Sequence, residues 1–522
     1  MSKRITNCRL ALPAVLFLWS SFAWAEVKPH ALFSDNMVVQ QGVPINVWGT
    51  AKAGEKVTVK LSTQEASVVA DGEGRWSVRL EAMKAGDALT MTISGDNTIS
   101  FKNMAVGEVW VASGQSNMQW PVRASTNAEK EIAEANYPNI RLFTVSRVVA
   151  GKPQTDVQGS WSVCSPQTVG DFSAVAYFFG RELHKAIKVP VGLINTSWGG
   201  TPAEAWTSMA VLEGEPAFKS ILDSWDARFK EYPAAIEAHI AAYGKAVREW
   251  LKSADSAEAA GKPIAPPPKL DFPGDPRTSP HRPAGLYNAM IHPLLPFGIK
   301  GAIWYQGESN AGRATQYRTL FSTMIRNWRK DWGLGDFPFL FVQLAPYQRE
   351  PANPPPGTWP ELREAQLLTM LNVPNTAMAV ITDVGEEKDI HPKLKQPVGA
   401  RLALAARALG YGERIEYSGP IYKDMKRDGS KIVISFTHTG GGLVAKGGPL
   451  KGFTIASSDQ KFVDAQAEIV GNTVVVSSPE VAEPAAVRYG WANFPVVNLW
   501  NKADLPASPF RTDDWPMVTA GK

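Results

Sequence analysis

Two short segments each place a serine beside glycine and amide- or carboxylate-bearing residues, directly after an apolar run. The first is "ASGQSNMQW", residues 112–120, and the second is "WYQGESNAG", residues 304–312. A serine nucleophile needs a base, a carboxylate that orients the base, and donors for the oxyanion. The two segments therefore raise the question of whether Ser116 or Ser309 is such a nucleophile.

Ser116 is the better candidate because it stands where a buried strand is expected to turn into a helix, with Gly114 allowing the sharp turn. At such a turn the backbone N–H of Ser116 points outward, and the helix dipole favours developing negative charge. The G-x-S-x-G elbow of α/β-hydrolases is absent, since Met118 occupies its last position. We predict that Ser116 is the nucleophile and that its N–H is one oxyanion donor.

The base should be one of seven histidines, and His391 has the most suggestive surroundings. It lies in "DIHP", residues 389–392, with a carboxylate two residues before it. At that spacing in a loop, Asp389 can reach the imidazole Nδ1–H and fix its tautomer. The alternative interpretation is a solvated loop histidine that merely has a charged neighbour.

The residues that would position this chemistry form a series of continuous apolar runs, which are typical of strands buried on both faces of a parallel sheet covered by helices. Polar or glycine-bearing segments follow four of them. In open α/β sheets, ligands bind beyond the carboxyl ends of the strands, so these segments are expected to meet. The runs are 104–113, 140–146, 191–197, 301–306, 337–344 and 376–383.

Other parts of the chain have a different pattern. Residues 26–103 alternate as short strands and turns, which predicts a β-sandwich, and residues 413–522 return to β character. Residues 208–275 read as a helical insertion, with a helix starting at Pro233. The catalytic α/β domain is therefore predicted in two parts, 104–207 and 276–412.

The first 25 residues read as a secretory signal peptide, which predicts a secreted or periplasmic protein. No later run is long enough for a membrane span. The formal charge of +4 gives no reason to expect nucleic acid as a partner. After the signal only Cys164 remains, which excludes an internal disulfide and favours a buried apolar role for this residue.

"GQSNM", "WGGTPAEAW", "WYQGESN" and "DIHP" together resemble the sialate O-acetylesterase family of SGNH-type carbohydrate esterases. The resemblance extends over nearly the whole mature chain. It implies a flavodoxin-like three-layer α/β/α core and an acetylesterase that acts on O-acetylated sugars through a serine and a histidine, without metal or cofactor. It also implies that Gly199 or Gly200 and the side chain of Gln306 complete the oxyanion hole, and that the last motif supplies the acid and His391.

The chain departs from the wider superfamily at two positions. The spacing is Asp-x-His rather than Asp-x-x-His, so the identity of the acid is not fixed by the motif. Asp389 is the first candidate, and three other carboxylates are alternatives: Asp383, Glu386 and Glu387. Gln306 stands where many relatives have asparagine, although a glutamine amide can donate the same hydrogen bond from a longer stem.

The predicted substrate contacts are residues of the two motifs that lie close to Ser116 and Ser309 in the sequence. Trp120, next to the nucleophile turn, is the best candidate for packing on a sugar ring. In the second motif Glu308 and Asn310 are also expected to brace neighbouring loops by hydrogen bonds. The full set is Gln115, Asn117, Trp120, Glu308 and Asn310.

These features predict a serine carbohydrate esterase that removes O-acetyl groups from sugars. Acetylated sialic acid and acetylated hemicellulose, such as xylan or xyloglucan, are both open as substrates, and the oligomeric state cannot be read from the sequence. One alternative is a non-catalytic carbohydrate-binding protein on an esterase-like core. Another is a short-chain lipase or thioesterase, although the aromatic residues here are interleaved with polar ones.

Overall fold

The computed structural model describes residues 26–349 and 357–521 of the chain. Its centre is a mixed sheet in the order β10-β9-β11-β8-β12-β13-β14, in which all neighbours are parallel except the edge strand β10. All six apolar runs predicted as strands are strands of this sheet. The strands are β8 (Thr98–Gly114), β9 (Tyr137–Thr144), β10 (Trp161–Cys164), β11 (Val191–Asn195), β12 (Gly301–Tyr305), β13 (Phe339–Val342) and β14 (Thr376–Ala379).

Helices cover both faces of this sheet, which explains why its strands are apolar throughout. Along β8, Val109 and Val111 join the core that contains residues of helices α6 (Ala314–Trp332) and α7 (Thr358–Asn372). Trp110 and Ala112 point the other way, into the core formed with α3 (Ala174–Ile187) and α8 (Gln396–Tyr411). Successive side chains of a strand alternate between faces, so each strand contributes to both cores.

Cys164, at the end of β10, is buried in the second of these cores. Burial raises the pKa of its thiol to about 12. A thiol that is both buried and protonated is a poor nucleophile and a poor metal ligand. Its surroundings agree with the apolar role predicted for it.

The N-terminal residues form a β-sandwich, as predicted, but it is not separated from the central sheet. The 17-residue strand β8 begins in the sandwich, where it pairs with β2 and β7, and continues into the central sheet. The predicted boundary between 103 and 104 therefore falls inside one strand. The remaining sandwich strands are β1 (Lys28–Pro29), β2 (Val38–Gln40), β3 (Ile45–Thr50), β4 (Lys56–Leu61), β5 (Gln64–Val69), β6 (Arg75–Leu80) and β7 (Gly86–Ser94).

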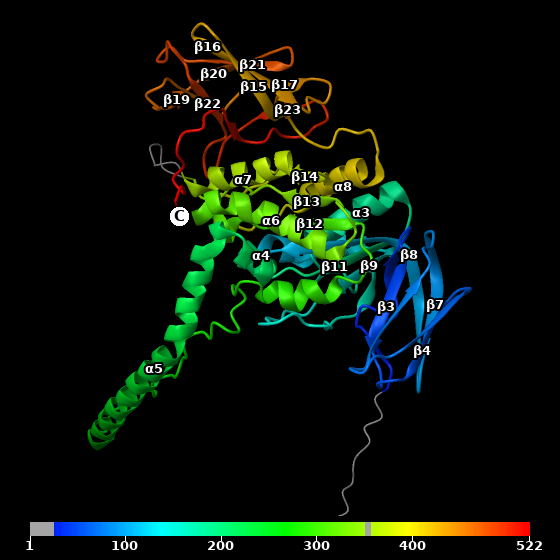
Figure 1. Cartoon of the computed structure of the whole chain (residues 1–522). Helices are drawn as coiled ribbons and strands as arrows, with labels where there is room; N and C mark the ends of the chain where they lie inside the picture. The colour runs from blue at the N-terminus through cyan, green and yellow to red at the C-terminus, as the bar shows by residue number, and fades with distance from the viewer. Residues whose placement is uncertain (1–25, 350–356, 522) are drawn as a thin grey trace, which may run out of the picture.

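The insertion contains one long helix, α5 (Lys219–Ala259), which projects away from the body of the molecule (Figure 1). It begins 14 residues before Pro233, so the prediction that Pro233 starts the helix is wrong: the proline lies inside it. Only the first turns of α5 are anchored in the core, through Ile221 and Trp225. Beyond them the chain returns along the helix, where Trp250 Nε1 donates to the carbonyl of Ala265 at 2.7 Å.

The C-terminal residues form a separate group of small antiparallel sheets, seen in orange and red in Figure 1. This agrees with the β character predicted after residue 413. One sheet contains β15 (Ile421–Asp428), β16 (Lys431–Thr437), β20 (Gln466–Val470) and β21 (Thr473–Ser477), a second contains β17 (Leu443–Ala445) and β23 (Leu499–Asn501), and a third contains β18 (Phe453–Ala456), β19 (Val463–Asp464), β22 (Ala486–Tyr489) and β24 (Phe510–Arg511).

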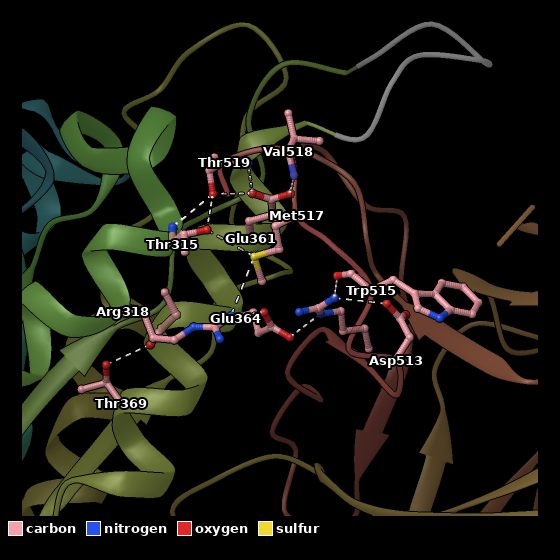
Figure 2. Close-up of polar contacts among 12 residues, drawn as sticks. Thr315, Arg318, Glu361, Glu364, Thr369, Asp513, Trp515, Met517, Val518 and Thr519 are labelled. Carbon is pink, nitrogen blue, oxygen red and sulfur yellow. Dashed lines mark hydrogen bonds and ion pairs between the residues drawn. The ribbon is translucent and has the colours of Figure 1, made fainter. Parts of the chain in front are cut away.

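The end of the chain is tied to α7 by two glutamates of that helix (Figure 2). The buried carboxylate of Glu361 accepts hydrogen bonds from the backbone N–H groups of Val518 and Thr519, at 2.6 and 3.0 Å. Glu364 accepts from Arg511 Nε at 2.6 Å. These contacts fix α7 against β24 and the segment that follows it. From the same helix, Gln366 Nε2 donates to the carbonyl of Gln306 at 3.1 Å, so α7 also supports the loop after β12.

The predicted signal peptide, residues 1–25, lies outside the described residues. Within the part of the chain that the structure describes, no helix combines the length and apolar character needed to cross a bilayer.

Candidate active site

The loops that follow β8, β11 and β12 meet at the carboxyl edge of the central sheet. Asn195 of β11 is in register with Ala112 of β8, and Tyr305 of β12 is in register with Gly114. Beyond the strand ends, the backbone N–H of Gln115 donates to the carbonyl of Tyr305 at 2.9 Å. The serine motif of residues 112–120 and the motif of residues 304–312 are therefore neighbours in space, as the strand pattern predicted.

Ser116 is the first residue of α1 (Ser116–Gln119), directly after the turn that ends β8. Gly114 makes this turn with φ of +132°, and a Cβ atom there would lie 2.2 Å from the carbonyl oxygen of Tyr305. Only glycine allows both the backbone angle and this close approach. Since α1 has only four residues, its dipole is much weaker than the sequence prediction assumed.

The side chain of His391 lies between those of Ser116 and Asp389 and contacts both. Ser116 Oγ is 2.8 Å from Nε2 of His391. The other ring nitrogen, Nδ1, is 3.4 Å from Oδ1 of Asp389, and the same oxygen accepts the backbone N–H of His391 at 2.9 Å. The first distance is that of a hydrogen bond, whereas the second exceeds the usual length for a charged pair. The geometry suits a serine activated by a histidine whose ring is oriented by a partly exposed carboxylate.

The other carboxylates that the sequence left open are engaged elsewhere. Asp383 forms a two-pronged ion pair with Arg401, with distances of 2.7 and 2.8 Å. Glu386 accepts the backbone N–H of Lys393 at 2.9 Å, and Glu387 lies 3.4 Å from Arg349. Asp389 is thus the carboxylate that the structure brings to the His391 ring.

The candidate oxyanion donors differ in how well they are placed. Gly199 lies against the nucleophile, because a Cβ there would be 3.2 Å from the Ser116 Cβ. Its backbone N–H, however, donates to Oε1 of Gln119 at 2.7 Å. A Cβ on Gly200 would have His281 as its nearest neighbour, at 3.9 Å. Gly199 is therefore the better placed of the two predicted glycines.

Gln306 is fully buried, and this argues against its predicted oxyanion role. Its Nε2 donates to Oδ1 of Asn310 at 2.6 Å and to the carbonyl of Thr201 at 3.3 Å. Both amide hydrogens are therefore used inside the protein. Gln119, which the sequence analysis did not single out, is half-exposed beside Gly199 and lies three residues after Ser116, one turn of α1 away.

Three of the predicted substrate contacts are buried and serve as ties between loops instead. Oε1 of Gln115 accepts the backbone N–H of Ser309 at 3.2 Å. Asn310 accepts the N–H of Ala203 at 2.9 Å, and the bracing role predicted for it agrees with this contact. The third is Asn117. A buried amide must find partners within the protein, so these side chains are not available to a substrate.

Trp120 is next to the base, but its ring is already occupied on one face. It stacks on the His391 imidazole with ring centres 5.1 Å apart and an interplanar angle of 16°. Its Nε1 donates to the carbonyl of Ala124 at 2.9 Å. The side chain thus packs on the base, and this contact was not predicted from the sequence.

Behind the site lies a buried lysine that the sequence analysis missed. Lys395 is fully buried, and its Nζ donates to Oδ1 of Asn117 at 2.5 Å. Nδ2 of the same amide donates to Oε1 of Glu308 at 2.7 Å and to the carbonyl of Ile390 at 3.0 Å. Burial lowers the pKa of Lys395 to about 7 and raises that of Glu308. No spacing rule links these three positions, so sequence alone offered no signal for the cluster.

A cleft of about 590 Å³ opens beside the site, between the strand-end loops and the first turns of α5. Gly200 and Ser309 form its border with the motifs described above. Arg228 of α5 lies over the Trp225 ring, 5.0 Å from its centre. The remaining lining mixes apolar and polar side chains: Pro202, Glu204, Ser220, Ile221, Ser224, His281 and Arg313.

Comparisons with known proteins agree on one family. A family profile described as "Carbohydrate esterase, sialic acid-specific acetylesterase" matches residues 279–407. The chain is 32% identical to a sialate O-acetylesterase of Rattus norvegicus, over 92% of this chain and 93% of that one. It is 30% identical to the human sialate O-acetylesterase, over 96% and 95% of the two chains.

A solved structure extends the likeness to the fold. The crystal structure of a carbohydrate acetylesterase from Xanthomonas citri is similar with a TM-score of 0.78 and 37% sequence identity. The match covers 94% of this chain and all of the other. The chain, with its mixed α/β sheet and additional C-terminal β-sheets, belongs to the sialate O-acetylesterase family and is a carboxylic ester hydrolase.

Proposed function

We propose that this protein is a secreted or periplasmic serine esterase that removes O-acetyl groups from sugars, with an SGNH-type catalytic domain. The observation that carries the proposal is the 2.8 Å contact between Ser116 Oγ and His391 Nε2 at the carboxyl edge of the parallel strands. A purely carbohydrate-binding protein would need neither group in this arrangement.

In the proposed reaction, Ser116 Oγ attacks the acetyl carbonyl while His391 Nε2 takes the hydroxyl proton. The tetrahedral intermediate collapses as His391 returns that proton to the sugar oxygen, which leaves as a free hydroxyl. Water then attacks the acetyl-serine with His391 again as base, and acetate leaves with Ser116 regenerated. The oxyanion is held by the backbone N–H of Ser116 and by that of Gly199, which must then turn from the Gln119 side chain to the substrate.

We assign the sugar to the cleft between α5 and the strand-end loops. Gly200 lines it and follows Gly199, which lies against Ser116, so we expect a ring bound there to direct its acetyl group toward the nucleophile turn. Charged and polar side chains beside the Trp225 ring suit a sugar, which offers hydroxyl groups and an apolar ring face, better than the long acyl chain of a lipase substrate. For this reason we propose a carbohydrate ester, rather than a lipid or a thioester, as the substrate.

The substrate test compares acetate release from O-acetylated sialic acid with release from acetylated xylan and xyloglucan oligosaccharides. The relatives named for sialate esters support the first, and the carbohydrate acetylesterase of known structure leaves the second open. We expect release from at least one class, and hydrolysis of a chromogenic acetate well above that of a long-chain ester. Faster hydrolysis of the long-chain ester would favour a lipase, and no hydrolysis of any ester would favour a binding protein.

Export is proposed from the charge and apolar pattern of residues 1–25 and from the "AWA" sequence that ends at Ala25. N-terminal sequencing of the exported protein is expected to begin at Glu26. An intact N-terminus in cell extract, with no exported protein, would contradict the proposal.

A further inference from the structure

We propose that Lys395, Asn117 and Glu308 form a buried positioning network that holds the loop of His391 against the nucleophile turn. The inference rests on the proposed function, since it assumes that His391 is the base. It assigns a role to Lys395, which does not touch the reacting atoms and acts through other residues.

The network joins parts of the chain that are far apart in sequence. Asn117 directly follows the nucleophile, Glu308 begins the short helix after β12, and Lys395 precedes α8. Asn117 receives the Lys395 ammonium at 2.5 Å and donates to Glu308 at 2.7 Å. Its second amide hydrogen goes to the carbonyl of Ile390 at 3.0 Å. Ile390 lies between Asp389 and His391, so this last bond holds the backbone that carries both.

The two charged groups fix which way the Asn117 amide points. Below the pKa of about 7 that burial gives Lys395, its ammonium can only donate, and an ionised carboxylate can only accept. The amide oxygen must then face Lys395 and the amide nitrogen must face Glu308. With both ends determined, the nitrogen is also the atom that faces Ile390. If the charge at either end were removed, the Asn117 amide could also adopt the reversed orientation, in which its nitrogen no longer faces Ile390. The charges thus act as an orientation lock on the nucleophile turn and the His391 loop.

The ammonium also acts on His391 electrostatically. The groups that face Lys395 are the carboxylates of Glu308, Glu386 and Asp389 and the rings of Trp120 and Tyr305, whose centres are 5.8 and 5.4 Å from Nζ. For His391, burial lowers its pKa, Asp389 raises it, and Lys395 lowers it further. A base must be neutral to take the serine proton, so the lysine extends the working range of His391 to lower pH.

Stability alone does not account for this arrangement. Replacing a buried ion pair by apolar groups is often neutral or stabilising, because the desolvation of both charges is avoided. Two buried opposite charges on one amide that joins the nucleophile turn to the His391 loop therefore fit a positioning role better than a purely structural one.

The test measures kcat/KM for a short acetyl ester against pH in the Lys395→Met variant. Lys393→Met is the matched control, because Lys393 is an exposed lysine in the same loop. We expect the Lys395 variant to lose roughly 10- to 100-fold in kcat/KM at the optimum, as misplaced catalytic groups do. The acid limb of its profile should move to higher pH, because the pKa of His391 rises when the positive charge is removed. The control should match the native enzyme in both respects.

A second variant guards against loss of folding, since Lys395→Met alone leaves a buried carboxylate without a counter-charge. In Lys395→Met/Glu308→Gln both charges are absent, so the melting temperature should recover relative to the single variant. Its acid limb should stay at the higher pH of the single variant, because Lys395 and Asp389 are the charges that shift the pKa of His391 and Glu308 is not one of them. Its kcat/KM should stay low, because the Asn117 amide is no longer held by charges at both ends. A merely structural role would change the amount of folded enzyme without moving the acid limb.

The inference is overturned if folded Lys395→Met keeps native kcat/KM with an unmoved acid limb. If only the double variant folds, the inference is likewise overturned when that variant keeps native kcat/KM. His391→Ala separates this failure from failure of the proposed function. Full activity in His391→Ala would remove the proposed mechanism itself, whereas an inactive His391→Ala beside a normal Lys395→Met would remove the network alone.

Discussion

The Ser116→Ala variant is expected to fold normally and to lose ester hydrolysis. Ser116 is the side chain within 2.8 Å of His391 Nε2, and alanine offers no oxygen to attack the acetyl carbonyl. In subtilisin, loss of the nucleophile costs roughly 10⁶-fold in kcat. We expect a loss of that order with a chromogenic acetate. The fold should be affected little, since the substitution removes one hydrogen bond of a half-exposed hydroxyl, worth about 1 kcal/mol.

Ser309→Ala is the matched control, because it changes the serine of the second motif. Ser309 is exposed, and its contact with Gln115 is made by the backbone N–H, which alanine retains. Most of the activity should therefore remain, although Ser309 borders the cleft and KM can change modestly. A folded Ser116→Ala enzyme with normal turnover, or an inactive Ser309→Ala enzyme, would contradict the assignment of the nucleophile.

The second large effect is expected for the acid. Asp389→Asn should lower turnover by roughly 10²–10³-fold, because the carboxylate fixes the imidazole tautomer and stabilises the imidazolium that forms during attack. In trypsin the corresponding change costs about 10⁴. We expect less here, since the side chain of Asp389 is 40% exposed and its oxygen lies 3.4 Å from Nδ1. Water can partly replace a carboxylate in that position.

Asp383→Asn should instead lower stability more than turnover. Asp383 holds Arg401 of α8 by two hydrogen bonds, and the Arg401 side chain is only 10% exposed. Breaking a fully buried pair costs roughly 3–5 kcal/mol, and the partial exposure of Asp383 reduces this to about 1–3 kcal/mol. Turnover on a short acetyl ester and melting temperature, measured for both variants, make the comparison. An Asp383 variant that is folded but inactive, beside a nearly normal Asp389 variant, would reverse the assignment.

The sequence by itself determined the parts of this protein that depend on local pattern. Continuous apolar runs predicted all six parallel strands, and the polar residues after them predicted which edge of the sheet would carry the chemistry. Gly114 and Ser116 were found because a sharp turn after a buried strand has a recognisable composition. Asp389 and His391 were found because they lie two residues apart. In each case the information lies within one short segment.

Only the tertiary structure decided how the buried polar groups are paired. Asp383 is excluded from the His391 ring because Arg401, 18 residues later, takes both of its oxygens. Gln306 turns inward to Asn310, and Lys395 reaches Asn117 across 278 positions of sequence. A buried donor or acceptor must be satisfied by whatever group the packing brings beside it, and that group is set by the approach of distant segments. Periodicity specifies which residues are buried, whereas their partners are fixed only when the sheet, its helices and its loops have assembled.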